Sequence, residues 1–492
     1  MTTDARTSCP VHADFEPRSP AFLADPFAVL ESLPRETPVF YAPSIDYYVV
    51  TRYSDIESVL LDHETYSAAP AQLPLAQLVP EAAKILLATG HKPQPSMVSL
   101  EPPAHTRLRS PTARAFTPRR VAPMEERIRA TVDQLLDAID PLTSFDLVSC
   151  LTFPLSATII FSFIGIPERD SPKLKEWCGH RASLAWGRPT PSEQVHHAEN
   201  MASYRGYLRE FVVTKTSARE ENFTGPLLAI HDEDPRALTH EEIASILHSL
   251  SFAGHETTNY LIGNLVRGLL EDPARWDAVA ADPGLIPGAV NETLRYDPSV
   301  PAWRRLTRRA VSLGGVDLPE GAKLFLWLAA SGRDASVFPE PERFDLRRAN
   351  ATKTLAFGKG IHYCVGAALG RLEAQIAVEA LTHRFPHLRL VEGQELSFHP
   401  NISFRGPQTL WVGAAQRTPG DIRTGMTHAQ AAGGGASRTA ACAAGSTSAL
   451  ERSGTLATFG TIGNAIHAQI CIPLSAYARA ANDAARSRYE AV

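Results

Sequence analysis

One cysteine, Cys364, stands in a glycine-rich loop directly before an amphipathic stretch that runs from Ala367 to about Arg384. A thiol at the start of a helix lies near the positive end of the helix dipole and near unpaired backbone N–H groups, which favour the thiolate. A thiolate held in this way is a ligand for a soft metal centre and is one of the few axial ligands that proteins give to haem iron. Glycines let the loop approach a flat cofactor closely, and this loop contains Gly358, Gly360 and Gly366.

The loop from Phe357 to Gly366 reads Phe-Gly-Lys-Gly-Ile-His-Tyr-Cys-Val-Gly. The pattern Phe-Gly-x-Gly-x-His-x-Cys-x-Gly is that of the haem-binding loop of the cytochrome P-450 family, which the chain resembles from residue 20 to about 412. The resemblance implies a mainly α fold with small β-sheets, a triangular helical prism with haem between a long central helix and the cysteine loop. It also implies that Cys364 is the axial iron ligand and that Phe357, Gly358 and Gly366 contact the haem.

The long central helix is visible in the sequence. Thr239-His240-Glu241-Glu242 is a capping box, and the helix that it opens is expected to continue through Leu270, with Pro273 just past its end. A mid-helix glycine, Gly254, and two adjacent threonines lower the helix propensity near the middle. A threonine hydroxyl is therefore expected to divert a backbone hydrogen bond and to open a local bulge there.

The same segment reads Ala-Gly-His-Glu-Thr over residues 253–257. It resembles the oxygen-activation motif of the family, which implies that Thr257 binds the oxygen molecule, that Glu256 helps to deliver protons from solvent, and that Ala253 and Gly254 contact the haem. For this segment alone, a surface glutamate and a threonine bonded back to its own helix are the favoured interpretation. Alongside Cys364, the functional interpretation is favoured.

Haem carries two propionates, which need cationic partners. Residues 101–109 resemble the family's segment that supplies a histidine and an arginine four residues apart, here His105 and Arg109, on one face of a helix. The resemblance extends to Arg305 and His362 at two further positions that contact the propionates. Arg304 is adjacent, so the choice between Arg304 and Arg305 stays open.

Glu292 and Arg295 are spaced as an (i, i+3) pair, which is common on exposed helices and contributes only a few tenths of a kcal/mol there. They also match the family's Glu-x-x-Arg helix, in which the pair is buried and braces the fold, and Arg343 is expected to join that network. By family position the substrate pocket would be lined mainly by apolar side chains, namely Leu100, Leu250, Ala253, Val300, Ala302, Trp303, Ile402 and Phe404.

The composition describes a globular protein with a large core, since 44% of the 492 residues are hydrophobic. A net charge of −5 argues against nucleic-acid binding. No signal peptide or membrane-spanning run is recognised, and the six cysteines form no paired framework, which together indicate a cytoplasmic protein without membrane contact. We expect a flexible N-terminus over residues 1–20, a haem domain over 21–415 and a low-complexity, disordered extension over 416–492.

These features predict a haem-thiolate monooxygenase (an oxidoreductase of EC class 1.14) that inserts one atom of O2 into a small apolar organic substrate, by hydroxylation or heteroatom dealkylation. The cofactor would be haem b. The chain looks closest to haem domains of the self-sufficient group with a fused reductase, but it lacks the cysteine run of a plant-type iron–sulfur module. Electrons from NAD(P)H are therefore expected through a separate ferredoxin or flavodoxin and its reductase, and the protein is expected to be a monomer.

Two other classes compete with this interpretation. The first is a peroxide-driven peroxygenase or an isomerase, against which the intact Glu256–Thr257 pair argues. The second is a non-catalytic haem protein for gas sensing or ligand carriage, which has no use for a proton relay.

Overall fold

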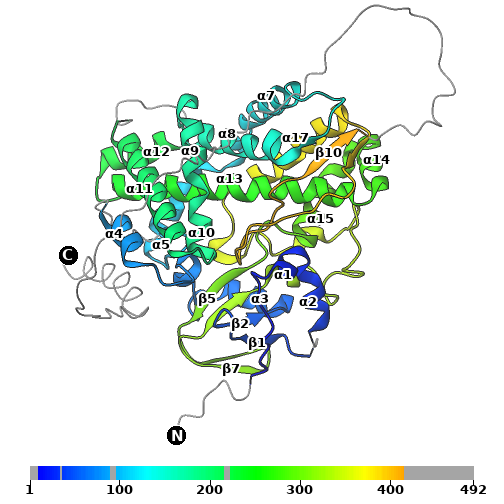
Figure 1. The fold of residues 1–492 in the computed structure, drawn as a ribbon. Helices are drawn as coiled ribbons and strands as arrows, with labels where there is room; N and C mark the ends of the chain where they lie inside the picture. Colours follow the sequence, from blue (N-terminus) through cyan, green and yellow to red (C-terminus); the bar gives the residue numbers. More distant parts are fainter. Residues whose placement is uncertain (1–8, 34–35, 89–95, 215–221, 415–492) are drawn as a thin grey trace, which may run out of the picture. The chain divides into compact units, whose positions relative to one another are not determined.

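The computed structural model describes residues 9–33, 36–88, 96–214 and 222–414, all within one compact unit (Figure 1). The expected extension over 416–492 lies outside the described residues. Most of the described chain is helical, in agreement with the expected fold class. The helices are α1 (Pro20–Ala24), α2 (Pro26–Ser32), α3 (Tyr53–Leu61), α4 (Pro80–Ala88), α5 (Ala104–Ala115), α6 (Pro118–Val121), α7 (Met124–Asp137), α8 (Phe153–Phe163), α9 (Ser171–Cys178), α10 (His180–Trp186), α11 (Pro191–Thr214), α12 (Thr224–Glu233), α13 (His240–Leu270), α14 (Pro273–Ala281), α15 (Ile286–Tyr296), α16 (Leu328–Ser331) and α17 (Ala367–Arg384).

The strands form small sheets beside these helices. A five-stranded sheet has the order β1-β2-β8-β5-β3, a three-stranded sheet has the order β4-β10-β9, and β6 pairs with β7 alone. The strands are β1 (Val39–Ala42), β2 (Tyr47–Val50), β3 (Tyr66–Ser67), β4 (Phe145–Asp146), β5 (Trp303–Thr307), β6 (Val311–Leu313), β7 (Val316–Leu318), β8 (Lys323–Leu326), β9 (Leu388–Leu390) and β10 (Trp411–Ala414). Two hairpins are present: β1 pairs with β2, and Gly314 and Gly315, both with positive φ, connect β6 to β7.

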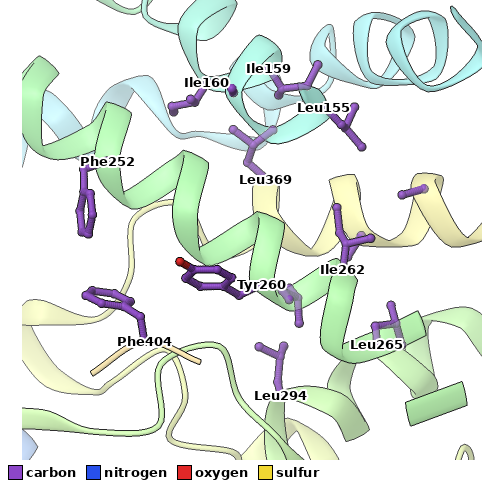
Figure 2. Close-up of a cluster of buried hydrophobic side chains, with 14 of the residues drawn as sticks. Leu155, Ile159, Ile160, Phe252, Tyr260, Ile262, Leu265, Leu294, Leu369 and Phe404 are labelled. Atoms are coloured by element: carbon purple, nitrogen blue, oxygen red, sulfur yellow. The ribbon is translucent and has the colours of Figure 1, made fainter. Parts of the chain in front are cut away.

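Helix α13 is the centre of the helical part (Figure 1). It begins and ends where the sequence predicts, and both halves of the capping box are formed: the Thr239 hydroxyl accepts from the Glu242 N–H, and the Glu242 carboxylate accepts from the Thr239 N–H. Most of its residues are buried, because α8, α11, α15 and α17 pack around it. Figure 2 shows Ile159 and Ile160 of α8 on one side of α13 and Leu294 and Phe404 on another.

The segment of residues 9–20, expected to be flexible, instead packs against the five-stranded sheet. Val11 forms a parallel bridge with Tyr41 of β1, and the N–H of His12 donates to the Tyr41 carbonyl at 3.0 Å. Phe15 is buried and meets the ring of Trp327 with the centroids 5.4 Å apart. The apolar surface that Phe15 buries explains why this part is ordered, since its burial offsets the entropy of fixing the chain.

Candidate functional site

The Cys364 loop folds tightly onto itself directly before α17. The N–H of Cys364 donates to the Phe357 carbonyl at 2.9 Å, and Gly358 and Gly360 adopt positive φ of 68° and 67°. A side chain at Gly360 would place its Cβ 2.7 Å from the Leu60 carbonyl oxygen, so this position requires glycine. These backbone contacts therefore help to fix the position of Cys364.

Opposing influences act on the pKa of the Cys364 thiol. Burial raises the pKa of the Cys364 thiol, whereas the backbone N–H groups of Gly366 and Ala367 and the guanidinium groups of Arg109 and Arg371 lower it. The balance lies above the ordinary value, so the start of α17 alone does not favour the thiolate to the extent that the sequence suggests. A cation at the sulfur would replace the thiol proton and remove that conflict.

The four basic residues predicted to hold the propionates come together beside this loop. The rings of His105, on α5, and His362 lie with their centroids 4.6 Å apart. Arg109, one turn after His105, donates to the carbonyl of Tyr363. Burial, with the charges of Arg305, His105 and Arg109, lowers the pKa of His362 to about 2.

Several donors of this basic cluster (His105, Arg109, Arg305 and His362) lack a partner. Both ring nitrogens of His105 and Nε2 of His362 are buried without a hydrogen-bond partner among the described residues. Arg305 is 3% exposed and donates to the carbonyl of Arg304 at 2.8 Å, and burial lowers its pKa to about 10. Buried donors are costly unless an acceptor meets them, so the cluster is suited to an anionic group.

Arg304 lies elsewhere. Its guanidinium donates to the carbonyls of Ala71 at 2.9 Å and Ala185 at 3.3 Å. Arg304 and Arg305 are neighbours on β5, and neighbouring side chains of a strand point to opposite faces. Of the two arginines that the sequence left open, Arg305 is therefore the one that lies with His105 and His362.

The middle of α13 presents one open face. Ala253 is exposed and Thr257 partly exposed, although Phe252, His255 and Glu256 beside them are buried. The Thr257 hydroxyl donates to the Ala253 carbonyl at 2.6 Å, so the predicted back-bond is present. The predicted bulge is absent, because α13 is α-helical throughout this segment. The hydroxyl satisfies a second lone pair of the carbonyl and leaves the helical hydrogen bonds in place.

Glu256 and Gly254 lie on other sides of the helix. The Glu256 carboxylate is buried, with one oxygen 3.8 Å from Nδ1 of His255. A Cβ on Gly254 would lie 2.6 Å from two carbon atoms of Ile160, which is labelled on α8 in Figure 2. In this structure Gly254 therefore permits the close packing of α13 on α8, and its missing side chain does not point to the face of Thr257.

The residues expected to line a substrate pocket are only partly brought together. Trp303 and Phe404 have ring centroids 5.9 and 4.9 Å from that of Trp186, and the N–H of Ile402 donates to the Trp186 carbonyl at 3.0 Å. Phe252 stacks on Trp186 at 5.6 Å and also meets Phe404, with the ring centroids 5.3 Å apart. Sequence reasoning missed Trp186 and Phe252, because an isolated aromatic residue in a helix is most often core. Of the other expected residues, Leu250 and Ala302 are buried, and Leu100 and Val300 are partly buried.

The buried ion pair of Glu292 and Arg295 is present on α15. Both side chains are fully buried, and two nitrogens of Arg295 donate to the two oxygens of Glu292 at 2.9 and 2.7 Å. The prediction that Arg343 is the third member of this ion-pair network is wrong. Its side chain is 63% exposed, and only its backbone carbonyl accepts a hydrogen bond from Arg295. Arg348 takes that place, with Nε 3.0 and 3.1 Å from the two oxygens of Glu292.

Comparisons with known proteins identify the family of this chain. The family model described as Cytochrome P450 matches residues 284–407. Erythromycin C-12 hydroxylase from Saccharopolyspora erythraea is 35% identical over 77% of this chain and 92% of its own length. The chain belongs to the cytochrome P450 family.

Solved P450 structures have the same fold. An intact type IV self-sufficient cytochrome P450 monooxygenase is 34% identical, with a TM-score of 0.80 over 83% of this chain and 54% of its own. Cytochrome P450 CREJ in complex with (4-ethylphenyl) dihydrogen phosphate is 36% identical, with a TM-score of 0.78 over 82% of this chain and 100% of its own. The P450 described here is thus a monooxygenase that acts on an organic substrate.

Haem b is the cofactor that this family implies, and the residues present fit it. The basic cluster could offer buried unpaired donors to the two propionates, Cys364 could supply a sulfur ligand, and the exposed Ala253 marks an open face of α13. When bound, haem b activates O2 with electrons that come from NAD(P)H. Within the described residues, no helix has the length and apolar character needed to cross a membrane.

Proposed function

We propose that Cys364 is the axial ligand of the haem iron and that His105, Arg109, Arg305 and His362 bind the haem propionates. The observation that carries the proposal is the basic cluster, whose buried ring nitrogens have no partner among the described residues. Helix α5, strand β5 and the cysteine loop itself supply these side chains. Such a convergence of desolvated donors is costly unless a ligand with acidic groups binds there.

Thr257 and Glu256 have different tasks in this proposal. The Thr257 hydroxyl donates to its own helix at 2.6 Å, so its oxygen faces the open side of α13 as a hydrogen-bond acceptor. It can therefore accept a hydrogen bond from a water molecule there. Glu256 is buried behind it, next to His255, and supplies the exchangeable proton from that side.

The proposed reaction is hydroxylation or heteroatom dealkylation of a small organic molecule with an apolar body. The aromatic cluster of Trp303, Phe404 and Trp186 supports an apolar substrate site. We assign residues 21–415 to the haem domain. A ferredoxin or flavodoxin with its reductase is the proposed electron source, and the protein is proposed to be a monomer. The free thiols of the described cysteines support the proposal that it lies in the cytoplasm.

Iron ligation is tested by the absorption spectrum of the reduced carbon monoxide complex of the haem-loaded protein. We expect the band of a thiolate ligand, and its loss in Cys364→Ser with unchanged far-ultraviolet circular dichroism. A band typical of histidine ligation in the folded wild-type protein would disprove the assignment.

The proton role is tested with Thr257→Ala and the adjacent Thr258→Ala as matched control. Thr258 is buried and lies towards Gly370 of α17, on another side of α13. With ferredoxin, reductase and NAD(P)H, Thr257→Ala should divert reducing equivalents to hydrogen peroxide at least tenfold more than the control. Equal coupling in the two variants, or full turnover with peroxide alone, would favour the sensor or the peroxygenase instead.

A further inference from the structure

A small polar pocket lies beside the first half of α13, and the Cys364 loop does not line it. Four segments meet there: the residues before α5, helix α10, helix α11 and the first turns of α13. Its lining is polar and rich in arginine. The residues are Ser96, Arg181, Arg205, Arg209, Glu241, Ala244, Ser245, His248 and Ser249.

Three arginines and one glutamate lie in this lining. The glutamate, Glu241, is already paired with Arg209, whose Nε donates to it at 2.6 Å. Arg181 is 9% exposed and forms no ion pair with a carboxylate in the described part of the chain. Its guanidinium instead contacts Nδ1 of His248 at 3.1 Å and lies over the ring of Phe252. A buried cation without a counter-ion is costly, and an anion in the pocket would remove that cost.

The electrostatic surroundings of Arg181 agree with this geometry. Burial and the neighbouring charge of Arg205 lower the pKa of Arg181 to about 10. The guanidinium is still protonated at neutral pH, so the charge is present and available to an anion.

A hydroxyl and the size of the pocket narrow the ligand chemistry. Ser249 is 5% exposed, and its hydroxyl has no hydrogen-bond partner among the described residues. It can donate to an oxyanion that Arg181 binds through charge-assisted hydrogen bonds. The volume of about 50 Å³ holds a few water molecules. That space suits a carboxylate or phosphate group but is too small for a whole substrate.

The pocket lines up with the open face of α13. Ser249, Ala253 and Thr257 are spaced four residues apart and form one stripe along the helix. With a rise of 1.5 Å per residue, Ser249 lies roughly 12 Å from Thr257 along the axis. A molecule of about that length can place one end at Ser249 and the other beside Thr257.

We propose that this arginine pocket binds the anionic end, a phosphate or carboxylate, of an elongated organic substrate whose apolar end reaches the Thr257 face. The inference rests on the proposed function, because it assigns the direction in which the substrate lies relative to the reacting face. The same oxyanion chemistry would also admit free phosphate as an effector, and the experiment separates the two sources.

The test uses the full-length, haem-loaded protein and follows the Soret band during titration with 4-butylphenyl phosphate and with 4-butylphenol. We expect the phosphate ester to bind at least tenfold more tightly than the phenol. Arg181→Met should weaken the phosphate ester at least tenfold and change the phenol less than twofold. Ser249→Ala should act in the same direction by a smaller factor.

Matched controls are Ser251→Ala and Arg236→Met. The Ser251 hydroxyl is buried but donates to the His248 carbonyl at 3.1 Å, and Arg236 is 93% exposed. Neither lines the pocket, so both should keep the preference for the phosphate ester. If Arg181→Met does not fold, the test is the comparison of Ser249→Ala with Ser251→Ala. Only Ser249→Ala should reduce the preference for the phosphate ester over the phenol.

Three results would overturn the inference: equal binding of ester and phenol, equal loss of both in Arg181→Met, or no effect of Ser249→Ala relative to Ser251→Ala. If inorganic phosphate raises the melting temperature while the ester leaves the Soret band unchanged, the pocket binds a free anion and the substrate assignment is wrong. Failure of the proposed function is distinguishable, because it removes the thiolate band of the carbon monoxide complex in the wild-type protein, whatever anions bind.

Discussion

The network around Glu292 separates two arginines that look alike in the sequence. Arg348 is 7% exposed, and its Nε meets both oxygens of Glu292 at 3.0 and 3.1 Å. Its other nitrogens donate to the carbonyls of Pro339 at 2.6 Å and Glu340 at 3.0 Å. Arg343, five residues earlier, is 63% exposed and lies 3.5 Å from the exposed carboxylate of Glu340.

We predict that Arg348→Met is strongly destabilising and Arg343→Met is not. Removal of one member of a buried ion pair costs about 3–5 kcal/mol. Because Arg295 still pairs with Glu292, the lower end of that range, about 3 kcal/mol, is expected for Arg348→Met. An exposed ion pair contributes about 0–1 kcal/mol, so Arg343→Met should cost less than about 1 kcal/mol.

The two variants are compared by urea unfolding, with far-ultraviolet circular dichroism as the probe and the free energy of unfolding taken by linear extrapolation. Both replace an arginine by methionine, so side-chain length and chemistry are matched. A cost for Arg343→Met equal to or larger than that for Arg348→Met would refute the placement of the network.

Two further predictions concern α17 and α13. Burial raises the pKa of Glu373 to about 8 from the usual 4.5. The folded state therefore keeps a proton that the unfolded state releases in this window, and stability falls as pH rises from 4.5 to 8, by on the order of 5 kcal/mol. Glu373→Gln should flatten this slope in urea unfolding between pH 5 and pH 8, and a wild-type slope that persists in the variant would contradict the assignment. Gly254→Ala should lower the free energy of unfolding by about 1–3 kcal/mol, because the new methyl group crowds Ile160. In an Ile160→Ala background the same change should instead stabilise the fold by up to about 1 kcal/mol. If Gly254→Ala destabilises the protein in both backgrounds, the two positions are not in contact.

The sequence predicted the local features of the fold well where one short segment determines them. The capping box at Thr239 and Glu242 placed the start of α13, and Pro273 marked its end. Helix α17 follows the cysteine loop with the predicted bounds, Ala367–Arg384. In each case neighbouring residues satisfy one another's backbone groups, so the pattern is readable without tertiary contacts.

The failures concern residues whose partners come from elsewhere in the chain. Arg343 and Arg348 lie in an irregular segment with no periodicity, so the sequence does not indicate which one turns inward. For Gly254, the packing partner that requires a glycine, Ile160, comes from another helix, so the sequence does not indicate it. The arginine pocket was not foreseen for the same reason. Arg181 and Arg205 each have the sequence context of an ordinary surface residue, and only the packing of α10 on α11 and α13 buries one of them.

The order of the strands has a consequence for synthesis of the chain. β2 pairs in parallel with β8, so Tyr48 lies opposite Leu324, and Phe15 packs on Trp327. The first strands to leave the ribosome must therefore wait for almost three hundred further residues before the five-stranded sheet can close. Until then only the β1–β2 hairpin exists, and one edge of β2 is unpaired, which is a state prone to non-native strand pairing. Slow translation would lengthen that exposure, so the yield of folded protein should depend on elongation rate and on chaperones that cover strand edges.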